Sequence, residues 1–126
     1  MNWYKSIVFK GGQLGRTIGF PTLNLDPHVL GKPYKEGVYA SLVEYAGQEY
    51  VGMLYLGPRL VLGETKQELE INVFDFDEEI YGQEIMFAIG EYIRSIANFT
   101  SFEEMKMQLE KDKKAVKSII NLPLAQ

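Results

Sequence analysis

Alternation of apolar and polar side chains is the feature that most restricts what this chain can fold into. Residues 69–76, LEINVFDF, show it best: apolar residues at 69, 71 and 73 alternate with Glu70, Asn72 and Phe74. Residues two apart lie on the same face of a strand, so Glu70 and Asn72 share the face opposite the apolar one. That pattern alone favours a solvent-facing Glu70, although in a barrel the same face can line a mouth.

Four further segments also have strand character before about residue 93: 3–9, 37–45, 49–56 and 83–91. Ala46, Gly47 and Gln48 predict a hairpin turn between the second and third of them. Short strands joined by glycine-containing turns predict a sandwich or a barrel. No strand-helix-strand alternation is visible, which argues against a parallel doubly wound sheet.

The C-terminal part of the chain changes to a helical period. Ser101 with Glu104 forms a capping-box signature, and Thr100 with Glu103 offers an alternative register. We expect one helix over about residues 101–120, ended by Asn121 and Pro123. Its apolar residues lie close to one stripe: Phe102, Met105, Leu109, Val116 and Ile119.

The charge and cysteine content exclude several classes of function. The chain has 126 residues, a formal net charge of -4 and no cysteine, which excludes disulfides, thiolate metal sites and cysteine nucleophiles. A mildly acidic chain lacks the basic surface of a nucleic-acid binder. No stretch approaches the ~20 apolar residues of a membrane span, and no signal peptide is evident. We expect one cytoplasmic domain over residues 1–126, without nucleic-acid or membrane partners, and a monomer.

A glycine-rich segment, residues 11–24 (GGQLGRTIGFPTLN), is the part that best fits chemistry. Glycine amides can point at phosphate oxygens, and Arg16 adds a permanent positive charge. Thr22 and Asn24 supply neutral oxygens on one side of an extended segment, which suits Mg²⁺. The spacing differs from a Walker A loop. A glycine-rich turn in which Thr22 and Asn24 bond their own backbone explains the composition equally well.

Residues 15–24, GRTIGFPTLN, closely resemble the signature of the riboflavin kinases, including the kinase module of bifunctional bacterial enzymes. That signature reads Gly-Arg-x-x-Gly-Phe/Tyr-Pro-Thr-x-Asn, and every fixed position matches. The resemblance continues in order through residues 37–40, 52–59, 75–76 and 80–82. Glu70 matches the family's catalytic glutamate, and Arg94 and Phe99 match residues before its last helix. Essentially the whole chain is covered.

The resemblance implies a mainly β fold, a six-stranded antiparallel Greek-key-like β-barrel with a C-terminal α-helix. It implies transfer of the ATP γ-phosphate to the ribityl 5′-hydroxyl of riboflavin, giving FMN and ADP. Riboflavin or FMN and ATP or ADP are therefore the expected small-molecule partners, with Mg²⁺ as the cofactor.

The same resemblance implies a role for each matching side chain. Glu70 would take the proton from the attacking hydroxyl. Mg²⁺ would be held by Thr22 and Asn24, and the flavin would lie near Arg94 and Phe99. Nucleotide binding would fall to five residues of the signature: Gly15, Arg16, Gly19, Pro21 and Thr22.

Three places depart from the family pattern. Asn72 stands where the family commonly has histidine, Leu60 and Val61 stand where it often has proline and threonine, and Ile96 stands where it often has glutamate. They motivate an alternative function, a non-catalytic flavin- or nucleotide-binding regulatory module on the same barrel. A purely structural barrel is a third hypothesis. The chain contains no nucleotidyltransferase domain, so we expect no FAD synthesis unaided; a stand-alone kinase and a module of a longer protein both remain open.

Overall fold

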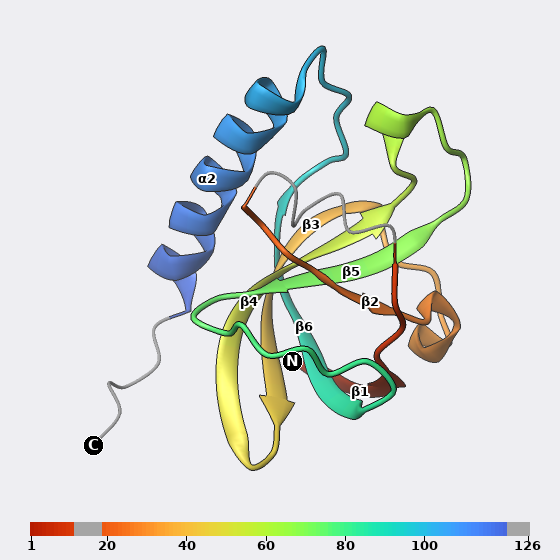
Figure 1. Cartoon of the computed structure of the whole chain (residues 1–126), viewed down its shortest axis with the longest axis vertical. Coiled ribbons are helices and arrows are strands. Elements are labelled where there is room, and N and C mark those ends of the chain that lie inside the picture. The colour runs from red at the N-terminus through yellow and green to blue at the C-terminus, as the bar shows by residue number, and fades with distance from the viewer. Residues whose placement is uncertain (12–18, 121–126) are drawn as a thin grey trace.

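One antiparallel sheet and one long helix make up the part of the chain that the computed structural model describes, residues 1–11 and 19–120 (Figure 1). The strands are β1 (Asn2–Ile7), β2 (Leu23–Leu25), β3 (Gly37–Tyr45), β4 (Gln48–Gly57), β5 (Glu68–Val73) and β6 (Glu84–Arg94). The helix is α2 (Phe102–Ile119), and two short 3₁₀ helices are η1 (Pro27–Leu30) and η2 (Leu60–Leu62).

The sheet curls into a half-barrel. Its strand order is β1-β6-β3-β4-β5-β2, and each neighbouring pair is antiparallel. The edges meet just beyond β1, where the Phe9 amide donates to the Asn24 carbonyl oxygen at 2.8 Å. The expected mainly β, six-stranded antiparallel fold with a C-terminal helix is confirmed, with partial closure of the barrel.

Five of the six strands lie where the alternation predicts them, within three residues at either end. The predicted hairpin is confirmed between β3 and β4, where Ala46 and Gly47 have φ of 52° and 78°. Positive φ at both central residues suits the twist of a two-residue hairpin. Strand β5 ends three residues earlier than expected, because the chain turns at Asp75, which has φ of 57°. The three-residue β2 is too short to show a period, and the sequence did not predict it as a strand.

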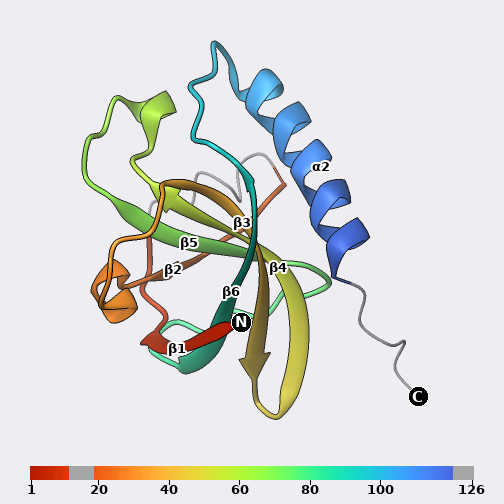
Figure 2. The same cartoon turned by 180° about the vertical axis from the view of Figure 1, so that it is seen from behind.

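The two faces of β5 pack against different parts of the molecule. Leu69, Ile71 and Val73 are buried inside the curl of the sheet. Phe74 belongs to a second apolar cluster on the outer face, together with Val116 of α2. Helix α2 crosses this outer face, as both ribbon views show (Figures 1 and 2). The face that carries Glu70 and Asn72 therefore looks toward the helix.

Helix α2 begins after Ser101, the first of the two cap positions that the sequence offers. The Glu104 amide donates to Ser101 Oγ at 3.1 Å, whereas the Glu104 carboxylate accepts from Thr100 Oγ1 at 2.5 Å. Phe102 and Ile119, expected on the apolar stripe, are exposed at 45% and 42%. None of the helices in residues 1–11 and 19–120 is long and apolar enough to cross a membrane.

Candidate active site

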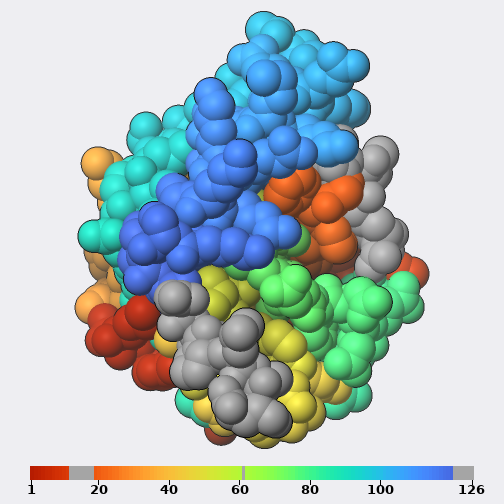
Figure 3. Space-filling view, turned by 90° about the vertical axis from the view of Figure 1, so that its left-hand side faces the viewer, coloured from red at the N-terminus to blue at the C-terminus, as the bar shows by residue number. Residues whose placement is uncertain are grey.

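A cavity lies between the outer face of the sheet and helix α2. Its polar wall comes from Thr22 just before β2, from β5 and from the connection after β4, and its apolar wall includes α2 and the segment before it. The space-filling view shows α2 across this face, with the orange segment that follows Gly19 beside it (Figure 3). Residues lining the cavity include Thr22, Arg59, Leu60, Glu70, Asn72, Arg94, Phe99, Met105 and Leu109.

Strand pairing brings the expected metal ligands to the expected base. Asn24 of β2 pairs directly with Glu70 of β5, so both side chains leave the same face of the sheet. Thr22 Oγ1 lies 3.5 Å from Glu70 Oε1. Three polar groups predicted from two separate segments of the sequence therefore form one cluster.

Arg59 joins this cluster, and the strand pattern offered no signal for its position. Its Nη2 donates to Asn24 Oδ1 at 2.9 Å and to Glu70 Oε1 at 3.0 Å. Its Nη1 also lies 3.7 Å from Glu64 Oε1. The side chain is 15% exposed. One guanidinium thus connects a proposed metal ligand with the proposed base.

The electrostatics of the cluster follow from its burial. Burial raises the pKa of the Glu70 carboxyl above its usual range, while the charge and hydrogen bond of Arg59 act in the opposite direction. Burial, followed by the charge of Glu70, raises the pKa of Tyr55 to about 12. Tyr55 therefore stays neutral, and its hydroxyl donates to the Pro58 carbonyl oxygen at 2.5 Å. This bond holds the backbone that leads into Arg59.

Two contacts hold the segment that carries Thr22 and Asn24. A Cβ at Gly11 would overlap the Asn24 side-chain amide, so a residue without a side chain allows that close approach. Asn72 Nδ2 donates to the Pro21 carbonyl oxygen at 2.6 Å. Asn72, one of the three departures from the family pattern, thus anchors the backbone just before Thr22.

The oxygen atoms of the cluster suit a magnesium ion. Thr22 Oγ1, Asn24 Oδ1 and the Glu70 carboxylate are hard oxygen donors gathered on one face of the β2–β5 pair. Within residues 1–11 and 19–120, no group of three histidine, cysteine, aspartate or glutamate side chains could hold a metal alone. Such a sparse set fits Mg²⁺, which usually takes one or two protein ligands and fills its shell with water and phosphate oxygens.

Arg94 and Phe99, expected on the flavin side, line the same cavity and contact each other. The Arg94 guanidinium carbon lies 6.0 Å from the centre of the Phe99 ring. Arg94 is held by Asp112 of α2, with Nε–Oδ1 at 2.9 Å and Nη2–Oδ2 at 2.8 Å. Asp112 is 2% exposed and was not predicted. Its sequence signal is a carboxylate within the apolar stripe of the helix.

A second hollow lies beside the first, and Thr22 lines both. Pro21, Phe76, Ile80 and Tyr81 line it as well. Gly19 precedes this segment with φ of 85°, a conformation that favours glycine. The two remaining residues predicted to bind nucleotide, Gly15 and Arg16, lie outside the described residues.

Comparisons with known proteins identify the family and the fold. The family model for riboflavin kinase (flavokinase) matches residues 3–120. The chain is 40% identical over 115 residues to the bifunctional riboflavin kinase/FMN adenylyltransferase of Haemophilus influenzae, covering 90% of this chain and 37% of that protein. It therefore spans well under half of that relative's length.

Two solved structures are similar in fold. A crystal structure described as a macrolide-efflux protein from Streptococcus pneumoniae is 32% identical with a TM-score of 0.78, covering 96% of this chain and 39% of that one. Riboflavin kinase from Trypanosoma brucei is 21% identical with a TM-score of 0.67, covering 96% and 80%. Because the family model spans nearly the whole chain, the protein belongs to the riboflavin kinase family.

Proposed function

We propose that this domain transfers the γ-phosphoryl group of ATP to the ribityl 5′-hydroxyl of riboflavin, giving FMN and ADP. The cluster of Thr22, Asn24 and Glu70 carries this proposal: Thr22 and Glu70 line a largely apolar cavity, and Asn24 pairs with Glu70. A flat aromatic ring with a hydroxylated chain suits such a cavity, because the ring needs apolar walls and the chain needs polar partners. ATP-dependent phosphorylation of riboflavin to FMN is the activity of the family.

Glu70 is the proposed general base. Its carboxylate takes the proton of the 5′-hydroxyl as that oxygen bonds to the γ-phosphorus. The bond between the γ-phosphorus and the bridging oxygen breaks, and ADP leaves with its electron pair. Mg²⁺ held by Thr22 and Asn24 would neutralise phosphate charge, which is most of what phosphoryl transfer requires from a protein.

The two hollows suggest where each substrate binds. We assign the flavin ring to the cavity under α2, near Phe99, Met105 and Leu109, with Arg94 at its wall. We assign the nucleotide to the hollow beside Pro21, together with Gly15, Arg16 and Gly19 of the signature. Thr22 lines both hollows. A residue shared by the two hollows lies where the two substrates have to meet for the phosphoryl group to pass between them.

The direct test is chromatographic detection of FMN after incubation with riboflavin and MgATP. Time-dependent FMN and equal amounts of ADP are expected. Flavin or nucleotide binding without FMN would instead support the non-catalytic binding module. Calorimetry that detects neither ligand would favour a purely structural barrel.

The metal assignment predicts a changed magnesium requirement. Thr22→Ala and Asn24→Ala should each raise the Mg²⁺ concentration needed for half-maximal MgADP binding by at least ~10-fold, because each removes an oxygen ligand. Titration calorimetry at fixed ADP measures this. Asn2→Ala, at an exposed position on β1, is the control. An unchanged Mg²⁺ dependence in both variants would place the metal elsewhere.

A further inference from the structure

Arg59 lies between the groups that phosphoryl transfer must bring together. Its Nη2 is 2.9 Å from Asn24 Oδ1, a proposed metal ligand, and 3.0 Å from Glu70 Oε1, the proposed base. In an in-line transfer the moving phosphoryl group passes between the metal-bound phosphates and the attacking hydroxyl. The guanidinium therefore borders the space that this group has to cross.

The second arginine that lines the cavity, Arg94, is already paired with a carboxylate. Of the two arginines that line the cavity in the described part of the chain, Arg94 bonds Asp112 through both Nε and Nη2. Arg59 has its shortest bonds to two groups that change partners in the proposed reaction. Asn24 would turn to the metal and Glu70 to the hydroxyl, so the guanidinium would need new acceptors. Phosphoryl oxygens are the acceptors that its forked donors match.

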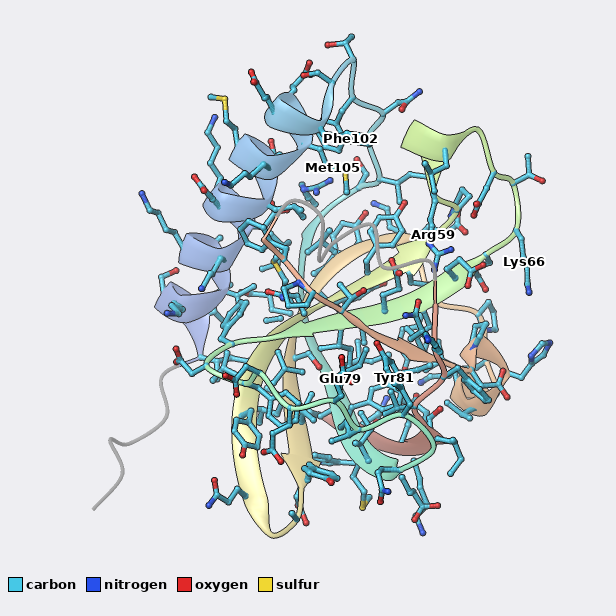
Figure 4. The ribbon with its side chains drawn as sticks, in the orientation of Figure 1. Arg59, Lys66, Glu79, Tyr81, Phe102 and Met105 are labelled. Carbon is cyan, nitrogen blue, oxygen red and sulfur yellow. The ribbon has the colours of Figure 1, made fainter. Side chains whose placement is uncertain are left out.

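Backbone hydrogen bonds fix the position of the Arg59 main chain, and they leave its side chain able to exchange hydrogen-bond acceptors. The Arg59 carbonyl oxygen accepts from the Leu62 and Glu64 amides at 3.0 Å and 3.3 Å. Gly63 ends this turn with φ of 70°, a left-handed conformation. Figure 4 shows the Arg59 side chain directed inward, whereas Lys66 farther along the same connection points away from the molecule. The connection thus presents one cation to the site and one to solvent.

We propose that Arg59 is a catalytic residue that contacts the phosphoryl group during its transfer and stabilises the charge on its oxygens. This inference rests on the proposed function. As the bond to the ADP oxygen breaks and the bond to the 5′-oxygen forms, the proton goes to Glu70. Arg59 donates hydrogen bonds throughout and neither gains nor loses a proton. A charged donor aimed at the transferring group acts mainly in the transition state.

The test compares R59M, R59K and the exposed control K66M. For each we would measure kcat, the Kd of MgADP, and the Kd of MgADP with aluminium fluoride in the presence of riboflavin. The fluoride complex mimics the phosphoryl group in transfer. R59M should lower kcat by ~10²-fold and weaken the fluoride complex by a similar factor, with MgADP affinity nearly unchanged. R59K keeps the positive charge but loses the forked pair of donors, so its kcat and its affinity for the fluoride complex should lie between those of R59M and the wild type. K66M should match the wild type.

Two results would overturn the role of Arg59 alone. One is an R59M enzyme with wild-type kcat. The other is an equal loss of affinity for MgADP and for the fluoride complex, which would make Arg59 a positioning residue. Binding of MgADP by R59M shows that the variant is folded. Absence of FMN formation by the wild type is a separate outcome, and it would overturn the proposed function together with this inference.

Discussion

Glu70→Gln lowers kcat for FMN formation by at least ~10²-fold and leaves MgADP affinity nearly unchanged, if the carboxylate is the general base. Glutamine has almost the same size, so it can still accept a hydrogen bond from Arg59 and occupy the position opposite Asn24. It cannot take a proton from the 5′-hydroxyl at neutral pH. The loss should therefore fall on kcat, with a smaller effect on riboflavin KM.

Steady-state kinetics with riboflavin and MgATP measure that effect, and calorimetry with MgADP checks the nucleotide site. Glu49→Gln, an exposed glutamate on β4, makes the same chemical change away from the cavity and should keep wild-type rates. Near-wild-type turnover in Glu70→Gln would remove Glu70 from the base role. A matching loss of MgADP affinity would instead make it part of the metal site.

Asp112→Ala should lower the free energy of unfolding by about 3–5 kcal/mol, because it leaves the half-buried Arg94 without its partner. Asp112 accepts three hydrogen bonds from Arg94 and a fourth from Gln108 Nε2 at 3.0 Å. The Arg94 side chain is 19% exposed, so water can solvate part of the stranded charge. The lower end of that range is therefore the expectation.

Urea unfolding followed by circular dichroism measures the change. Glu110→Ala, at an exposed position on the same helix, should alter stability far less. Because Arg94 lines the cavity, Asp112→Ala should also weaken riboflavin binding more than MgADP binding. Equal unfolding free energies for the two helix variants would contradict the structural role of this ion pair.

The sequence by itself determined most of the secondary structure, and the family resemblance supplied Glu70 as the expected base. Alternation is a local property, so it located five strands and assigned Glu70 and Asn72 to one face of β5. The turn at Ala46 and Gly47 could also be predicted from the sequence, because a two-residue hairpin requires positive φ at its central residues. The cap at Ser101 needed only residues within one helical turn.

Only the tertiary structure decided what surrounds Glu70. A strand period says that two faces differ, but the partner that covers each face comes from far along the chain; here α2 encloses the face that pattern alone would leave to solvent. The pairing of Asn24 with Glu70, and the bonds of Arg59 to both, depend on strand register and on the course of a connection. Asp112 interrupts the apolar stripe of α2, and only the packing of the helix against the sheet places Arg94 opposite it. Contacts between residues far apart in the chain produce no periodic pattern in a single sequence. Each partner's identity depends on the residue that it contacts in the fold, not on its neighbours in the chain.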